Sequence, residues 1–263
     1  MSILRSTAKL AFAGADRLLP RPTGPRLLIY HQVGAGLGRQ MEVGVADFEW
    51  HLDWLQAERE VVTLDEALRR WNDPAADRLV VLTFDDGYLD TWTTAFPRLL
   101  EFGLPFTLYL ATHSIESGEP LGPAGAADPL TWDQVGEMVD SGLVTVGAHT
   151  HTHVDLTRLA SEPILEEVSM SDDLIERRLG LRPRHFAYPW GHWSATAESV
   201  LAERYESAVV GGFVKAPSRL HPMRVRRYPI QLSDGTRYFR ARLRGGLRAE
   251  ESLRRRIRGY RGP

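Results

Sequence analysis

Residues 79–87 read Leu-Val-Val-Leu-Thr-Phe-Asp-Asp-Gly, an apolar run that ends in two adjacent carboxylates and a glycine. The run has the length and the β-branched content of a buried strand, so Asp85 and Asp86 are predicted to lie at a strand tip. Two neighbouring carboxylates repel each other and resist joint ionisation unless a cation or a shared proton relieves them. The stretch therefore indicates a metal site, or a carboxylate that acts as a base.

A second polar cluster follows another apolar run. Residues 147–153 read Gly-Ala-His-Thr-His-Thr-His, and imidazole is a favoured ligand of zinc. A helical turn would put His149 and His153 on one face with His151 turned away, whereas a strand would align all three. The spacing leaves an Asp-His-His site and a three-histidine site both open.

Seven apolar, β-branched or aromatic runs recur along the chain and alternate with helix-like segments. This alternation indicates a parallel sheet buried on both sides, either closed into a barrel or doubly wound. In both architectures ligands bind at the carboxyl ends of the strands, where the Asp pair and the histidines would meet. The runs cover residues 27–33, 79–84, 106–111, 143–148, 185–188, 208–213 and 225–230.

The composition narrows the class of protein. A chain of 263 residues, 43% of them hydrophobic, can build one full core, and we expect one domain. The formal charge of −2 argues against a general polyanion binder, so no nucleic-acid partner is expected. The chain contains no cysteine, so a zinc site must use histidine and carboxylate ligands.

The two ends of the chain differ from its centre. We expect an N-terminal helical extension over residues 1–25 and an arginine-rich helical tail over 236–263. Residues 10–15 form an apolar patch shorter than the roughly 7 to 15 residues of a signal peptide, and no run approaches the about 18 apolar residues of a membrane span. We therefore predict a cytoplasmic or membrane-peripheral location, with membrane contact through the terminal helices as the alternative to packing on the domain. The oligomeric state is not predicted.

A catalytic metal with three protein ligands and an open position lowers the pKa of a bound water to about 7. The reaction still needs a base for the proton of that water and an acid for the leaving group. Asp85 fits the base, and His31, His192 and His221 are candidates for the acid.

Three motifs, in this order, resemble those of the polysaccharide deacetylase family, the NodB-homology domain of carbohydrate esterase family 4. They are Thr-Phe-Asp-Asp-Gly at 83–87, His-Thr-His-Thr-His at 149–153 and Phe-Ala-Tyr-Pro-Trp-Gly at 186–191. The likeness covers residues 26 to 232. It implies a distorted (β/α)7 barrel in a single α/β domain, which we place at residues 26–235.

The resemblance also implies a ligand set. Asp86, His149 and His153 would hold a divalent metal, for which Zn²⁺ is the best match, with His151 outside the set. Asp85 would be the general base, and the backbone N–H of Trp190 would stabilise the oxyanion.

The resemblance implies His31 as the acid, because Tyr30-His31-Gln32-Val33 is similar to a motif of the biofilm poly-N-acetylglucosamine deacetylases. His221 is the alternative acid, but it stands one place too early for the family's Leu-x-His motif. A second departure concerns the base. Many members carry an arginine in the third motif that orients it, and Ala187 stands there in this chain, so Arg184 or a residue elsewhere would have to substitute.

Aromatic and ring side chains near the predicted rim would form the floor for an acetyl methyl group and stacking surfaces for sugars. We predict substrate contacts for Tyr88, Tyr188, Pro189 and Trp132, with Trp193 as a further guess.

The predicted function is metal-dependent hydrolysis of an N-acetyl group, in preference to an O-acetyl group, on a sugar or polysaccharide, with release of acetate. The substrate partner is then an acetylated carbohydrate. Two alternatives stay open: an amidohydrolase of the same barrel that acts on a small non-sugar amide, and a degenerate member that binds glycan without turnover.

Overall fold

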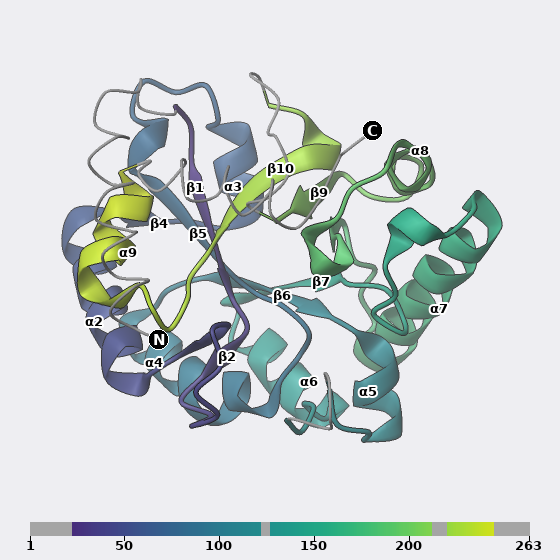
Figure 1. Cartoon of the computed structure of the whole chain (residues 1–263), viewed down its shortest axis with the longest axis horizontal. Coiled ribbons are helices and arrows are strands. Elements are labelled where there is room, and N and C mark those ends of the chain that lie inside the picture. The colour runs from purple at the N-terminus through teal and green to yellow at the C-terminus, as the bar shows by residue number, and fades with distance from the viewer. Residues whose placement is uncertain (1–22, 122–126, 212–219, 245–263) are drawn as a thin grey trace.

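The computed structural model describes residues 23–121, 127–211 and 220–244, and its centre is a closed ring of seven parallel strands (Figure 1). The ring runs in the order β1, β10, β9, β8, β7, β6, β5, and β5 pairs back to β1. The strands are β1 (Arg26–Tyr30), β5 (Leu79–Phe84), β6 (Phe106–Leu110), β7 (Val144–Ala148), β8 (His185–Ala187), β9 (Ser207–Val210) and β10 (Val225–Pro229). The predicted single-domain (β/α)7 barrel is confirmed, and each of the seven apolar runs supplies one strand.

Three short strands complete the described sheets. β4 (Glu60–Val61) pairs with the first residues of β5, and β2 (Gln32–Val33) pairs in parallel with β3 (Glu42–Val43). The β2–β3 pair follows directly from the carboxyl end of β1, so it lies at the end of the barrel where the polar motifs were expected. The end of the predicted run 208–213 falls in residues 212–219, outside the described residues.

Helices surround the ring, with α2 and α9 on one side and α7 and α8 on the opposite side in Figure 1. The helices are α2 (Val45–Glu58), α3 (Leu64–Arg69), α4 (Phe96–Phe102), α5 (Thr112–Ser117), α6 (Trp132–Asp140), α7 (Ser161–Leu179), α8 (Ala195–Ala202) and α9 (Gly235–Leu243). A π-helical turn (Thr91–Ala95) precedes α4, and 3₁₀ turns cover Ala76–Arg78, Leu156–Arg158, Pro189–Gly191 and Pro222–Arg224.

Local sequence signals account for several helix ends. The Thr131 side chain accepts a hydrogen bond from the Gln134 N–H, and the Gln134 side chain accepts one from the Thr131 N–H, which is a complete capping box at the start of α6. Gly180 ends α7 in the left-handed conformation (φ 68°), where a side chain would be unfavourable. These ends fix where the loops to the site begin.

The core has two layers, as a barrel requires. Leu27, Val81, Val209 and the larger Tyr109 fill the ring, while a larger shell including Leu82 and Phe106 packs between the strands and the helices. Strand residues therefore alternate between ring and shell. A polar side chain that points into the ring must find a partner there.

Helix α9 packs against α2. His51 of α2 stacks on Phe239 with ring centroids 3.8 Å apart, and the buried Arg242 guanidinium pairs with the Asp234 carboxylate at 2.8 Å. Of the predicted tail over 236–263, the structure describes a helix only to Leu243, and residues 1–22 of the predicted N-terminal extension lie outside the described residues. Among the described residues, every helix is too short or too polar to cross a bilayer.

Candidate metal and catalytic site

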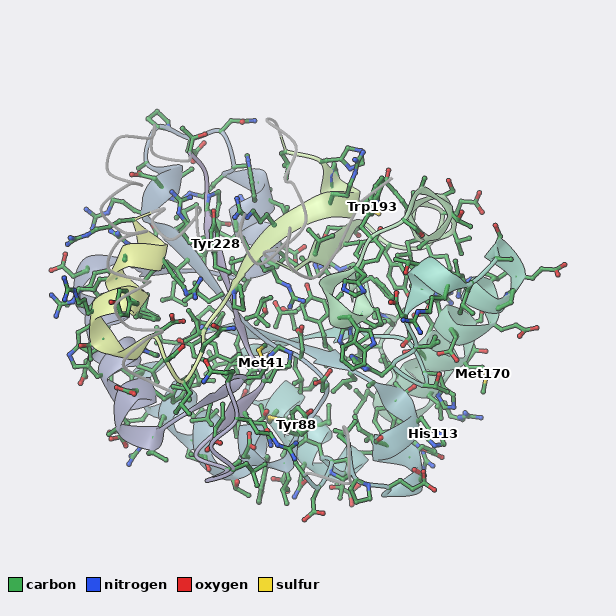
Figure 2. The ribbon with its side chains drawn as sticks, viewed as in Figure 1. Met41, Tyr88, His113, Met170, Trp193 and Tyr228 are labelled. Carbon is green, nitrogen blue, oxygen red and sulfur yellow. The ribbon has the colours of Figure 1, made fainter. Side chains whose placement is uncertain are left out.

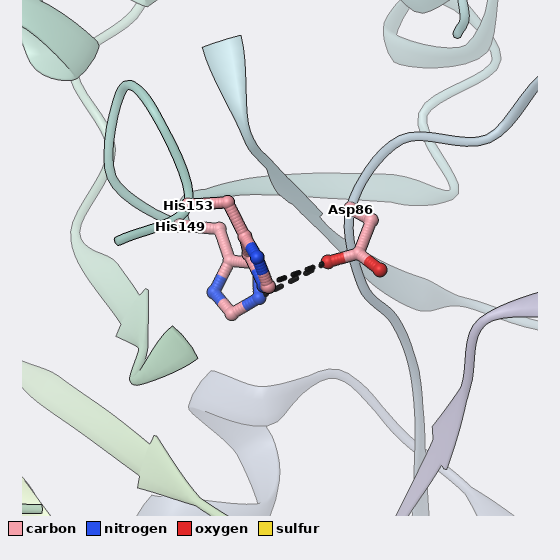
Figure 3. Close-up of side chains that lie close together, drawn as sticks. All are labelled: Asp86, His149 and His153. Atoms are coloured by element: carbon pink, nitrogen blue, oxygen red, sulfur yellow. Dashed lines mark ion pairs between the residues drawn. The ribbon is translucent and has the colours of Figure 1, made fainter. Parts of the chain in front are cut away.

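Asp86, His149 and His153 converge at the carboxyl ends of β5 and β7 (Figure 3). The Nε2 atoms of both histidines lie 3.3 Å from Asp86 Oδ1, and the three potential ligand atoms lie within 4.8 Å of one another. Asp86 and His149 are buried, and His153 is partly exposed. The arrangement presents one oxygen and two nitrogens to a common point.

The orientation of His149 is fixed by a backbone contact. Its Nδ1–H donates a hydrogen bond to the Ala187 carbonyl oxygen, with Nδ1 and O 2.7 Å apart, which leaves Nε2 as the atom facing Asp86. His151 points elsewhere: its Nδ1 lies 3.0 Å from Thr112 Oγ1, and its backbone N–H donates to Glu167. The structure thus brings together His149 and His153, which are four residues apart in the sequence, and leaves His151 outside the group.

The backbone around this group is strained. Four non-glycine residues in the described chain have left-handed backbone, namely Asp86 (φ 76°), Thr150 (φ 66°), His153 (φ 58°) and Trp190 (φ 61°). Such conformations cost of order 1 kcal/mol or more each and concentrate where the surrounding structure imposes them for function. All four lie in the three polar motifs, which supports assigning a functional role to this end of the barrel.

Asp85 is held by an arginine from the opposite part of the sequence. Arg227 of β10 directs Nη1 and Nη2 to Oδ1 and Oδ2 of Asp85 at 2.5 and 2.7 Å, and its Nη1 also donates to Thr83 Oγ1. Both side chains are buried. Burial alone would raise the pKa of Asp85, but the charges of Arg227 and His149 outweigh it and lower that pKa.

Ala187 stands where many family members carry the arginine that orients the base, and in this chain Arg227 pairs with Asp85 instead. The sequence analysis did not identify Arg227. Arg184 binds Asp65 and Glu206 instead, at the start of β8 and away from Asp85. A signal was present, because an arginine inside an apolar strand must be paired when it faces the core. Its partner could not be inferred, since 142 residues separate the two side chains.

The three candidate acids lie in different surroundings. His31 is near the carboxylates: a positive charge on it acts on Asp85, Asp86 and His153, and its Nδ1 is buried without a hydrogen-bond partner in the described structure. His192 Nδ1 lies 3.0 Å from Asp155, and His221 Nε2 lies 3.8 Å from Glu198 of α8.

Trp190 lies on the exposed side of the metal-ligand group. Its ring centroid is 5.1 Å from that of His153, and the side chain is 57% exposed, the largest value among the exposed large hydrophobic residues. The next residue, Gly191, has φ 69°, and a Cβ there would lie 2.5 Å from Gly211 Cα. Close packing of two glycine backbones therefore holds the Trp190 peptide beside the ligands.

The predicted substrate residues divide into two groups. Tyr88 is half-buried, and its phenol faces the carboxylate of Asp86, which contributes to raising the pKa of that phenol after the larger effect of burial. Tyr188 and Pro189 are buried, and the Tyr188 ring packs edge-on against Phe186, so neither offers a surface to a sugar.

The side chains of Trp132 and Trp193, both predicted to contact the substrate, bind other residues of the protein. Trp132 Nε1 donates to Glu116 of α5 at 2.7 Å, within the outer helical layer. Trp193 lies near α8 (Figure 2), donates to Glu198 and is covered by Arg224, whose Cζ is 4.6 Å from the ring. Tyr88 faces Asp86, and Trp190 packs against His153, so these two predicted residues lie beside the metal-ligand group.

The geometry agrees with a comparison against protein families, in which the model described as polysaccharide deacetylase matches residues 72–205, just over half of the chain. The chain belongs to this family. The matched region contains Asp85, Asp86, His149, His153 and Trp190, whereas Arg227 lies beyond it.

Two curated proteins are similar to this polysaccharide deacetylase family member. One is the putative polysaccharide deacetylase YxkH of Bacillus subtilis, 27% identical over 66% of this chain and 59% of that protein. The other is the poly-β-1,6-N-acetyl-D-glucosamine N-deacetylase of Staphylococcus epidermidis, 25% identical over 55% of this chain and 52% of that protein. The chain matches little more than half the length of each relative.

Solved structures of deacetylases share the barrel. The deacetylase PplD of Streptococcus pyogenes, in complex with acetate, superposes with a TM-score of 0.68 at 24% identity over 80% of this chain and 93% of that one. IcaB from Ammonifex degensii superposes with a TM-score of 0.65 at 25% identity over 81% and 89%. The first likeness supports the fold alone.

The three residues of the ligand group fit a divalent metal. Asp86 Oδ1 is buried and has no hydrogen-bond partner within the described residues, so its charge needs compensation at that point. One carboxylate and two imidazoles are a donor set that zinc uses in catalytic sites.

Proposed function

We propose that this chain is a metal-dependent deacetylase that removes N-acetyl groups from a sugar or polysaccharide and releases acetate. The observation that carries the proposal is the convergence of Asp86, His149 and His153 beside Asp85, which Arg227 holds in place. Zn²⁺ bound by the three residues would polarise the acetyl carbonyl and lower the pKa of a water molecule.

Asp85 is the proposed general base. It follows the carboxyl end of β5, directly before Asp86, and it keeps its charge because Arg227 lowers its pKa against the effect of burial. With both oxygens fixed by the guanidinium, a remaining lone pair can take the proton of the attacking water.

His31 is the proposed acid. Its position near Asp85, Asp86 and His153 puts it beside the reacting group, and its buried Nδ1 has no described partner that would compete for a proton. In this role it donates a proton to the amine nitrogen as the bond to the acetyl carbon breaks. His221 is a weaker candidate because its Nε2 lies 3.8 Å from Glu198 of α8.

The Trp190 backbone N–H is the proposed oxyanion donor. The Trp190 ring lies against His153, so its peptide is next to the ligand group, and the Gly191–Gly211 contact restricts its movement. A donor held in place before the reaction stabilises the developing negative charge without a cost of reorientation. The exposed indole of Trp190, with Tyr88, would contact the sugar ring.

The names of the relatives support N-acetyl over O-acetyl chemistry, since one of them is an N-deacetylase of a poly-N-acetylglucosamine. An amide also demands more of the site than an ester, because its amine leaving group needs a proton. A histidine placed to supply that proton is consistent with an amide substrate.

The test is acetate release by the purified chain from matched N-acetylated and O-acetylated oligosaccharides, with Zn²⁺ supplied and again after chelation. Release from the N-acetylated set that disappears on chelation would support the proposal. Release only from a small non-sugar acetamide would favour the amidohydrolase alternative. Glycan binding without release, in protein shown to hold zinc, would favour a non-catalytic binding role.

A further inference from the structure

We infer that Glu167 of α7 is a positioning residue for the metal ligand His153, because its carboxylate holds the loop that joins the two histidine ligands. The inference rests on the proposed function and extends it to a residue that was not singled out in the sequence. We call residues 150–152, which lie between His149 and His153, the ligand loop.

The two histidine ligands are held in different ways. His149 directly follows β7, its backbone N–H donates to the Leu110 carbonyl at 3.0 Å, and its ring is fixed by the Ala187 carbonyl. His153 comes after the ligand loop and belongs to no strand or helix, and its ring lies against the rings of His149 and Trp190. The position of His153 relative to His149 therefore depends on the conformation of the ligand loop.

That conformation is one the backbone does not favour by itself. Thr150 has φ 66° and His153 has φ 58°, and both carry a Cβ that makes the left-handed region unfavourable. Such residues persist only where the surrounding structure imposes their conformation. Contacts from outside the ligand loop must therefore hold it in place.

Glu167 supplies three of these contacts. Its Oε2 accepts hydrogen bonds from the backbone N–H groups of His151 at 3.1 Å and Thr152 at 2.8 Å, and its Oε1 accepts one from Thr152 Oγ1 at 2.7 Å. Hydrogen bonds to an ionised carboxylate are stronger than those between neutral groups. Because Glu167 binds the backbone of His151, these contacts remain when the His151 side chain is removed.

The carbonyl groups of the ligand loop are held by a second helix. The backbone N–H groups of Thr112 and His113, at the start of α5, donate to the carbonyls of Thr150 at 3.3 Å and His151 at 2.9 Å. Helices α5 and α7 lie side by side in Figure 1 and contact each other. The ligand loop is thus bound through its N–H groups by α7 and through its carbonyls by α5.

The helix that carries Glu167 is anchored in the core. Ile164 and Val168, on either side of Glu167 in α7, are both 0% exposed. The carboxylate is therefore attached to a backbone that core packing fixes. Glu166 stands next to it on the same helix and is exposed, so it offers a matched control with the same side chain.

Loss of Glu167 leaves the N–H groups of the ligand loop without this acceptor and lets its left-handed residues relax. His153 Nε2, which lies 3.3 Å from Asp86 Oδ1, would then move out of its place in the ligand group. Removal of residues that orient a metal ligand through hydrogen bonds lowers metal affinity by about 10- to 100-fold.

The experiment measures zinc binding by calorimetry to the full chain, Glu167→Ala, Glu167→Gln and the control Glu166→Ala. Glutamine keeps one oxygen for the two N–H groups and gains an amide N–H that can donate to Thr152 Oγ1, so it retains the hydrogen bonds without the charge. Absorption spectra of the Co²⁺-loaded proteins report how the ligands are arranged around the metal. Urea unfolding of the metal-free proteins reports their stability.

Glu167→Ala should bind zinc roughly tenfold or more weakly than the wild-type chain and change the Co²⁺ spectrum, whereas Glu167→Gln and Glu166→Ala should stay within about threefold. Equal zinc affinity in wild type and Glu167→Ala overturns the inference, even if that variant is less stable. A loss in Glu167→Gln as large as in Glu167→Ala would assign the effect to charge and overturn positioning. Weaker binding with an unchanged Co²⁺ spectrum does the same.

Thr152→Val provides the test if Glu167→Ala does not fold, because it removes one hydrogen bond from an exposed residue of the ligand loop. Zinc binding should weaken by roughly two- to fivefold, and unchanged affinity overturns the inference. A wild-type chain that binds no zinc overturns the ligand set and the inference together. A zinc-loaded wild-type chain that releases no acetate from any oligosaccharide overturns the proposed function alone.

Discussion

Arg227 and Asp85 form a two-pronged ion pair across the inside of the barrel, with N–O distances of 2.5 and 2.7 Å and side chains that are 1% and 5% exposed. A guanidinium fixes both oxygens of a carboxylate in one plane, which an ammonium group cannot do. The pair therefore sets the orientation of Asp85 as well as its charge.

Replacing Arg227 with lysine keeps a positive charge but removes the planar group that binds both oxygens of Asp85. We therefore expect kcat/KM to fall by about 10²-fold or more through misplacement of Asp85. Arg227→Gln leaves Asp85 buried and unpaired, which costs about 3 to 5 kcal/mol of unfolding free energy. Because the largest effect that opposes burial is then lost, the pKa of Asp85 should rise, and the acid limb of the pH–rate profile should move to higher pH.

The control for this prediction is Arg184→Gln, which removes an arginine that binds Asp65 and Glu206 at the other end of β8. The acid limb should not move in this variant. An acid limb that stays in place in Arg227→Gln would show that Arg227 does not tune Asp85.

Metal binding should depend on His149 and not on His151. At a zinc concentration one hundred times its dissociation constant, the wild-type chain should gain about 2.7 kcal/mol of unfolding free energy. His149→Ala should lose this gain, because it removes one of three atoms that converge within 4.8 Å, while His151→Ala should keep it. Zinc titration by calorimetry, together with thermal unfolding, checks both variants, and equal affinity in His149→Ala and wild type would refute the ligand set.

His31→Ala should reduce turnover on N-acetyl substrates by roughly 10²- to 10⁴-fold, the range typical of a lost general acid. His221→Ala should have a much smaller effect, because its described contact is with Glu198. The loss in His31→Ala should be smaller for an activated O-acetyl ester, whose leaving group needs less protonation. Steady-state kinetics on both substrates test this, and a larger loss in His221→Ala would reverse the assignment.

The stability of the fold should depend on pH through His51. Burial against Phe239 lowers the pKa of His51 from 6.5 to about 3, while the Asp234 charge opposes this shift. Below pH 6.5 the unfolded chain binds a proton that the folded chain does not, so stability contributed by this residue is lost as the pH falls from 6.5 toward 3. At pH 5 the loss should be about 2 kcal/mol relative to pH 8.

Urea unfolding of the wild-type chain and His51→Gln at the two pH values isolates this effect, because the other titrating groups are common to both proteins. The difference in unfolding free energy between them should change by the stated amount. The same difference at both pH values would contradict the predicted proton linkage.

The Gly191–Gly211 contact should tolerate no side chain. Gly191→Ala places a Cβ at 2.5 Å from Gly211 Cα on a residue with φ 69°, so we expect a loss of about 2 to 3 kcal/mol in unfolding free energy. Gly136→Ala is the matched control: this glycine lies inside α6 with open space around its Cβ position, and the change should add about 0.5 to 1 kcal/mol. Urea unfolding measures both, and a stable Gly191→Ala would show that the loop can shift.

The sequence by itself determined the seven strands of a parallel sheet and the candidate metal ligands, and the family resemblance implied that the sheet closes into a barrel. The seven strands follow from apolar runs whose periodicity is local, and the site follows from motifs at the ends of those runs, because parallel strands bring their carboxyl ends to one rim. Asp86, His149 and His153 were identified through the family resemblance, since spacing alone allowed three histidines as well. The structure brings those three together and turns His151 toward Thr112.

Only the tertiary structure decided the partner of Asp85 and the place of each aromatic side chain. Arg227 reaches Asp85 because β10, β1 and β5 are neighbours in the closed ring, a relation that depends on ring closure and not on local residue preference. The sequence predicted Tyr188 and Trp132 as surfaces for sugar stacking. In the structure Tyr188 is buried, and Trp132 donates a hydrogen bond to Glu116. The tendency of a segment to form a strand depends on residues that are neighbours in the sequence. The side-chain partners across a barrel depend instead on strand register, which the order of residues along the chain does not specify.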